Sequence, residues 1–254
     1  MAGNLGKSSI MKKLILVTND AQSCGKTSVA LALSEYLRKK QIKHCLVHTS
    51  VDQELPCETE LLNLEDGINP SEMVQLLGAN DAVICDIHTE NGQDFSSFFH
   101  KHGMDEVLME LNAELTIVLP ICDDSEVHRQ ALLMAEAYTG MGEFVAVRAS
   151  LLADVPESFG GSATQKALKL LGATILAAPA LAESTLDLID ELELTLPLAL
   201  TQRHLLPRFL THQLLAWEVE WAEAFSSYPE HFLPQHDKLD DLGVESAYGQ
   251  LLSA

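Results

Sequence analysis

Short apolar segments recur along the chain and alternate with stretches of helical periodicity. Residues 26–40 place apolar side chains at helical spacing and end in Arg38-Lys39-Lys40, cations that favour a helix C-terminus. The alternation predicts an α/β fold, in which a mostly parallel, helix-covered sheet carries its ligand site at the carboxyl ends of the strands. The predicted strands are residues 14–17, 43–48, 81–86, 114–119, 144–147 and 173–177.

Helices are expected around these strands, and the pattern changes after Pro197. A long amphipathic helix over 205–225 places Trp217 and Trp221 on one face, where packing against the sheet is favoured and a partner surface is the alternative. The segment 51–67 is acidic and is predicted to be a loop. The other predicted helices are residues 70–77, 105–111, 164–171 and a segment that follows Asp124 and ends at Tyr138.

The chain is predicted to form one domain with two appendages. Residues 1–10 are small and polar, so we expect a disordered N-terminal extension outside the fold. The domain would span 11–228, with a helical extension over 199–228, and residues 229–254 would form a flexible polar tail.

The segment between the first strand and the first helix has the chemistry of a phosphate-binding loop. Residues 20–28 read DAQSCGKTS, and Gly25-Lys26-Thr27 fits the end of the motif G-x-x-x-x-G-K-[ST]. In such a loop, backbone N–H groups surround the phosphates, Lys26 neutralises their charge and the Thr27 hydroxyl ligates Mg²⁺. Asp20 replaces the opening glycine; Asn and Asp tolerate the left-handed backbone better than most residues, so we expect Asn19 and Asp20 to make the turn.

Other side chains complete a candidate ATP and Mg²⁺ site. Asp86 ends an apolar strand, where a carboxylate can hold Mg²⁺ or its water shell, although strand-ending Asp residues also serve as turn formers. Asp52 follows the second strand and is a candidate to orient an attacking water. For Cys24, a small filler role is favoured over redox gating. The predicted catalytic residues are Lys26, Asp86 and Asp52; the cofactor-binding residues are Cys24, Gly25, Lys26, Thr27 and Ser28; the metal ligands are Thr27 and Asp86.

Composition narrows the class of partner. A net charge of −21 over 254 residues disfavours direct nucleic-acid binding and favours basic protein partners, although acidic surfaces also simply keep proteins soluble. Five scattered cysteines suit a reducing cytoplasm. The longest weakly polar stretch, 170–181, is shorter than the roughly 20 residues needed to cross a bilayer. Acidic residues on the polar face of the Trp helix disfavour membrane attachment; they are Glu218, Glu220 and Glu223.

The loop and Asp86 together resemble the deviant-Walker P-loop ATPases of the ParA/MinD superfamily. The chain looks closest to conjugal-transfer proteins of the TraL/StbC kind, in the segment that runs from 84–87 to 94–98 and in 104–120 (MDEVLMELNAELTIVLP). The resemblance implies ATP and Mg²⁺ as ligands, Asp86 in the Walker B place and a homodimer. It further implies protein partners in plasmid conjugation, partition or positioning.

Departures from that family pattern keep three functions open. Ala21 replaces the family's signature lysine, and His48-Thr49-Ser50-Val51 replaces its paired acids, so a slow or regulated ATPase switch is expected. The first alternative is a catalytically inactive P-loop protein that binds a basic partner. The second is an ATP-dependent ligase similar to dethiobiotin synthetase, which would need lysines at the strand ends that this sequence largely lacks.

Overall fold

The computed structural model describes residues 10–49, 59–61, 69–89, 91–148 and 158–236. Its core is a sheet with strand order β3-β2-β4-β1-β5-β6-β7, in which every neighbouring pair is parallel. The α/β class and all six predicted strands are confirmed. The strands are β1 Ile10–Val17, β2 His44–His48, β3 Thr59–Leu61, β4 Ala82–Asp86, β5 Ala113–Ile121, β6 Glu143–Arg148, β7 Thr174–Ala177 and β8 Gln235–His236.

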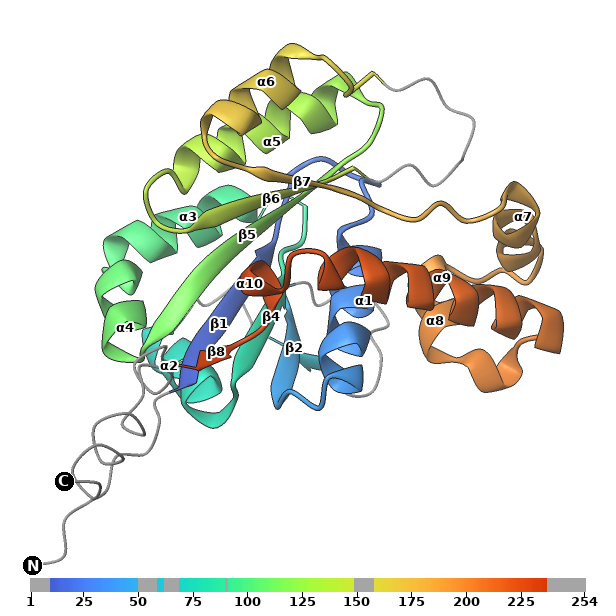
Figure 1. Cartoon of the computed structure of the whole chain (residues 1–254), viewed down its shortest axis with the longest axis horizontal. Helices are drawn as coiled ribbons and strands as arrows, with labels where there is room; N and C mark the ends of the chain where they lie inside the picture. Colours follow the sequence, from blue (N-terminus) through green and yellow to red (C-terminus); the bar gives the residue numbers. More distant parts are fainter. Residues whose placement is uncertain (1–9, 50–58, 62–68, 90, 149–157, 237–254) are drawn as a thin grey trace, which may run out of the picture.

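Helices connect the parallel strands and cover both faces of the sheet (Figure 1). Within the described ranges, none of them combines the length and apolar character that a membrane-crossing segment needs. The helices are α1 Lys26–Lys39, α2 Pro70–Ala79, α3 Gly92–Lys101, α4 Met104–Glu110, α5 Ser125–Ala137, α6 Ala163–Leu170, α7 Glu183–Glu191, α8 Leu196–Thr201, α9 Arg208–Ser226 and α10 Pro229–Phe232, with a 3₁₀ turn at Arg203–Leu205.

The side chains of β1 alternate between two hydrophobic cores, one on each face of the sheet. Leu14 and Leu16 pack in the core that α2 to α6 complete, whereas Ile15 and Val17 pack in the core completed by α1 and α7 to α10. All four side chains are fully buried. This double burial explains why the strand is a continuous apolar run rather than an alternating one. It also makes β1 the rigid base of the loop that follows it.

Helix α9 is a packing helix, as the sequence favoured. It lies beside α1 (Figure 1), and Trp221 is 2% exposed, with its ring stacked on Phe225 at a centroid distance of 5.0 Å. The indole N–H of Trp217 donates to the carbonyl of Pro179 at 2.8 Å. Both tryptophan side chains therefore stabilise the fold by packing in its interior.

Two predicted segments need correction. The tail was predicted to begin at 229, but α10 and β8 belong to the fold: Phe232 is fully buried, and Gln235 pairs with Met11 in an antiparallel bridge between β8 and β1. Ile10, which the sequence assigns to the N-terminal extension, is the first residue of β1 and is in register with His236 of β8. The predicted loop 51–67 contains strand β3, and the remaining residues of that loop lie outside the described ranges.

Helix α3 was missed because its sequence gives little helical signal. It contains Gly92 and a run of aromatic side chains, and its N-cap residue Asn91 makes no side-chain capping bond. Phe95 and Phe99 are nevertheless buried against the sheet and contact each other at a centroid distance of 5.5 Å. Tertiary burial thus overrides weak local propensity here.

Candidate functional site

The loop after β1 turns sharply into α1 at Gly25. Gly25 has a φ of 84°, in the left-handed region that glycine adopts without a steric penalty, and it forms the N-cap of α1. Ser23 also has a positive φ, of 54°. The first turn of the helix lines a cavity at the strand ends, and a helix N-terminus with free backbone N–H groups favours anions.

The ammonium of Lys26 is held inside this loop. Its Nζ donates to the carbonyls of Asn19 and Ala21, each at 2.7 Å, and to the hydroxyl of Thr89 at 3.0 Å. These bonds use all three protons of the ammonium, and the side chain is buried. A phosphate oxygen can bind Lys26 in this conformation only by replacing one of these acceptors.

Asp86 lies across a cavity from the loop. It is the last residue of β4 and is in register with Val17, the last residue of β1. A cavity of about 250 Å³ lies between the loop and Asp86, and it is lined by all the predicted site residues that the structure describes. Its lining includes Cys24, Gly25, Lys26, Thr27, Ser28 and Asp86. Asp52, the remaining predicted catalytic residue, lies outside the described residues.

His48 is a site residue that sequence reasoning missed. It ends β2, which pairs with β4 so that His48 is in register with Asp86. Its Nδ1 lies 2.9 Å from Oδ2 of Asp86, and both side chains are only 2% exposed. The available signal was its position at a strand end, which it shares with Asp86; what the sequence did not reveal is that β2 lies next to β4.

The residues present fit a nucleotide with Mg²⁺. Within the described ranges, neither carboxylate oxygen of Asp86 makes a hydrogen bond, although both are buried. A buried carboxylate without donors has the free lone pairs that a hydrated cation requires. The Thr27 side chain belongs to the same cavity, and Lys26 supplies the positive charge for phosphates.

Cys24 behaves as a buried filler of the loop. Its side chain packs with Ala21 and Val127 and is 2% exposed. Burial raises the pKa of the Cys24 thiol, and the nearby Lys26 ammonium only partly opposes this effect. The thiol is therefore protonated and unreactive near neutral pH.

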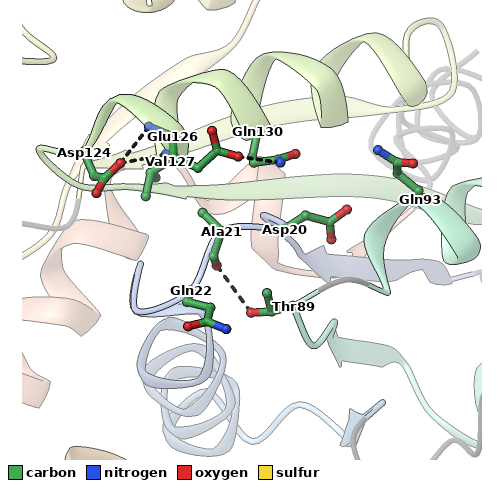
Figure 2. A pocket seen from close by; sticks show the side chains of 9 residues that line it. All are labelled: Asp20, Ala21, Gln22, Thr89, Gln93, Asp124, Glu126, Val127 and Gln130. Atoms are coloured by element: carbon green, nitrogen blue, oxygen red, sulfur yellow. Dashed lines mark hydrogen bonds between the residues drawn. The ribbon is translucent and has the colours of Figure 1, made fainter.

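A second cavity adjoins the loop on its other side. It measures about 580 Å³ and lies between the loop, α3 and α5 (Figure 2). Two of its carboxylates are already engaged: Asp124 accepts backbone N–H bonds at the start of α5, and Glu126 pairs with Arg129. Thr89 lines both cavities, so they share one wall. The full lining is Asp20, Ala21, Gln22, Thr89, Gln93, Asp124, Glu126, Val127 and Gln130.

Comparison with known proteins finds distant similarity to solved structures. No family model matches the sequence, and no curated protein matches it. Among solved structures, the chain is similar to a ParA family ATPase from Chlorobium tepidum TLS, with 14% identity, a TM-score of 0.47 and coverage of 84% of this chain and 99% of that chain. It is also similar to the MinD cell division protein of Aquifex aeolicus, with 14% identity, a TM-score of 0.44 and coverage of 85% and 97%.

A chain of the MinC:MinD cell division protein complex from Aquifex aeolicus is a further neighbour. It has 11% identity and a TM-score of 0.42, over 66% of this chain and 81% of that chain. At such low identity, these similarities give no information about what this chain binds.

Proposed function

We propose that this chain binds ATP with Mg²⁺ in the cavity between the loop and Asp86 and acts as a slow or regulated ATPase switch. The observation that carries the proposal is the meeting of Gly25-Lys26-Thr27 with the buried carboxylate of Asp86 around one cavity. The two segments are far apart in the sequence, and parallel pairing of β1 with β4 brings them together. Phosphate-binding groups and a cation-binding carboxylate are the two halves of a nucleotide site.

Each side chain has a distinct role in this site. The N–H groups at the start of α1 bind phosphate oxygens, and the Lys26 ammonium neutralises their charge. The Thr27 hydroxyl and Asp86 hold the metal. A bound Mg²⁺ would supply positive charge that offsets the negative charge developing on the phosphates. Asp52 is proposed to orient the attacking water.

Slow turnover follows from two features of the loop. Ala21 provides no charge at the place where the deviant-Walker family has its signature lysine, so a second copy of the chain could not supply one to the nucleotide. In addition, the three protons of Lys26 are already bonded to loop carbonyls and Thr89. Rearrangement of the ammonium therefore precedes its full contact with phosphate, and this is a step that a partner can regulate.

We place the switch in the cytoplasm, in plasmid conjugation, partition or positioning, with a protein partner and a homodimeric state. This proposal is supported by the resemblance of residues 84–98 and 104–120 to conjugal-transfer proteins of the TraL/StbC kind. The net charge of −21 favours a basic partner.

Calorimetric titration with Mg-ATP tests the nucleotide site. We expect Lys26→Ala to bind about tenfold to a hundredfold more weakly than the wild type, because it removes charge-assisted hydrogen bonds. Lys39→Ala is the matched control, since Lys39 ends the same helix on its exposed side. Equal affinity in wild type and Lys26→Ala would reject the proposal and favour the inactive interaction protein.

The ATP-dependent ligase is retained as a second candidate because of the second cavity. That cavity adjoins the phosphate loop through Thr89 and has room for a small substrate. ATP turnover that appears only when a small carboxylic acid or amine is added would support the ligase. Turnover that responds to a protein partner instead would support the switch.

A further inference from the structure

The inner wall of the phosphate cavity is an imidazole next to a carboxylate. His48 and Asp86 lie side by side at the ends of β2 and β4, and both line the cavity together with the loop. Within the described ranges, neither ring nitrogen of His48 makes a hydrogen bond, and neither do the carboxylate oxygens of Asp86. The 2.9 Å contact between them lacks the alignment of a hydrogen bond. Two buried polar groups thus retain free ligand atoms at one place.

The spacing of these atoms suits two ligands of one cation. Ligands about 2.1 Å from a metal and at right angles to each other are roughly 3.0 Å apart. Nδ1 of His48 and Oδ2 of Asp86 are 2.9 Å apart. An ordinary structural pair would show the ring N–H aimed at the carboxylate, and this alignment is missing.

We infer that His48 and Asp86 coordinate the divalent cation of the nucleotide together, so that the site prefers a first-row transition-metal dication to Mg²⁺. This inference rests on the proposed nucleotide site and specifies its metal. Imidazole is a favourable ligand for transition metals, whereas Mg²⁺ strongly favours oxygen.

Nucleotide is needed to complete the coordination. In the described residues, no three His, Cys, Asp or Glu side chains form a self-sufficient metal site. His48 and Asp86 supply two ligands, and the Thr27 hydroxyl and phosphate oxygens supply others. The cation is therefore bound tightly only when nucleotide is present.

Pulsed electron paramagnetic resonance of Mn²⁺ tests the imidazole bond directly. The full chain is loaded with ADP and Mn²⁺, and electron spin echo modulation is recorded. We expect ¹⁴N modulation from a directly bound imidazole in the wild type and its loss in His48→Asn. The control is His44→Asn: His44 lies on the same strand, but its ring nitrogens are within 2.9 Å of Ser34 Oγ and the Ile42 carbonyl.

Calorimetry with ADP and either Co²⁺ or Mg²⁺ measures the preference of the site for a transition-metal dication over Mg²⁺. We expect His48→Asn to weaken Co²⁺ binding about tenfold or more, because loss of even an outer-shell partner of a metal costs that much. Mg²⁺ binding should change much less.

The outcomes separate this inference from the proposed function. If wild-type protein binds ADP and Mn²⁺ without ¹⁴N modulation, the inference is overturned while the nucleotide site stands, and this result needs no variant to fold. Equal Co²⁺ and Mg²⁺ losses in His48→Asn would also overturn it. If the wild type binds no nucleotide, both fail.

Discussion

The carboxylate of Asp20 accepts a hydrogen bond of 2.8 Å from the backbone N–H of Gly92, the first residue of α3. This contact accounts for an acidic residue at the place where a phosphate loop normally begins with glycine. Asn91, the N-cap of α3, makes no side-chain capping bond, so Asp20 caps that helix from outside it. The negative charge is stabilised by the helix N-terminus and is directed toward α3.

Replacing Asp20 by glycine should therefore lower the stability of the fold and strengthen the binding of Mg-ATP. We predict that Asp20→Gly lowers the free energy of unfolding by about 1–2 kcal/mol, through the lost cap and the added backbone freedom. Removal of a negative charge near the phosphates should strengthen Mg-ATP binding several-fold. Urea denaturation and calorimetry measure the two effects. Asp20→Asn separates them, because it keeps the acceptor but not the charge; unchanged affinity in both variants would refute the electrostatic account.

The sequence predicted that the loop and Asp86 lie at the same edge of the sheet, and the structure places both around one cavity. Lys26 and Asp86 could be predicted because each follows an apolar run, and parallel strands end at the same edge. His48 could not, because its role depends on β2 lying next to β4, a neighbour relation that is set by the order of the sheet.

The same limit applies to the fold. The packing of Phe232 and the pairing of β8 with β1 join the two ends of the described chain, and no local pattern reports such a contact. By contrast, the burial of a continuous apolar strand or a periodic helix can be predicted from its own sequence. Helix α3 is an intermediate case. Its Phe residues indicate that the segment is buried, but they do not indicate that it is helical.

Cys24 should react slowly with alkylating agents. Because burial raises the pKa of its thiol, the thiolate fraction at pH 7.5 is smaller than in free cysteine. We expect iodoacetamide to modify Cys24 at least about tenfold more slowly than N-acetylcysteine, with a rate that rises toward pH 9.5. Peptide mass spectrometry over a time course measures this rate, and Cys24→Ser identifies the peptide. Rapid labelling at pH 7.5 would instead reveal an activated thiol.

Burial of the Glu218 carboxyl should make the stability of the protein depend on pH. Burial raises the pKa of Glu218, while Arg203 opposes this effect. A carboxyl whose pKa is raised in the folded state binds more protons there than when unfolded, so stability falls as pH rises from the unfolded pKa through the folded one.

Arg203→Ala should enlarge this effect. Without the guanidinium, ionised Glu218 is left buried, and we expect a loss of about 2–3 kcal/mol at pH 8. At pH 5 the loss should be smaller, because protonation of Glu218 removes the buried charge. Urea denaturation at both pH values measures the difference. Arg208→Ala, at an exposed position nearby, is the control; equal losses at the two pH values would show that the pair does not govern this region.

Truncation of Trp221 should show that α9 is a structural helix. Its ring is 2% exposed, stacks on Phe225 and meets Trp217 edge-on at a centroid distance of 5.7 Å. Removal of a buried aromatic side chain leaves a cavity, so we predict that Trp221→Ala lowers the free energy of unfolding by about 3–5 kcal/mol.

Phe209 provides the matched control on the same helix. It is 59% exposed, and Phe209→Ala should change stability by less than about 0.5 kcal/mol. Unfolding in urea is followed by far-ultraviolet circular dichroism, because the Trp221 variant loses a fluorophore. If the two substitutions cost the same, Trp221 is not anchored in the core. A large loss of stability in Trp221→Ala and a small one in Phe209→Ala would confine any role of α9 in partner binding to its exposed side, where Phe209 lies.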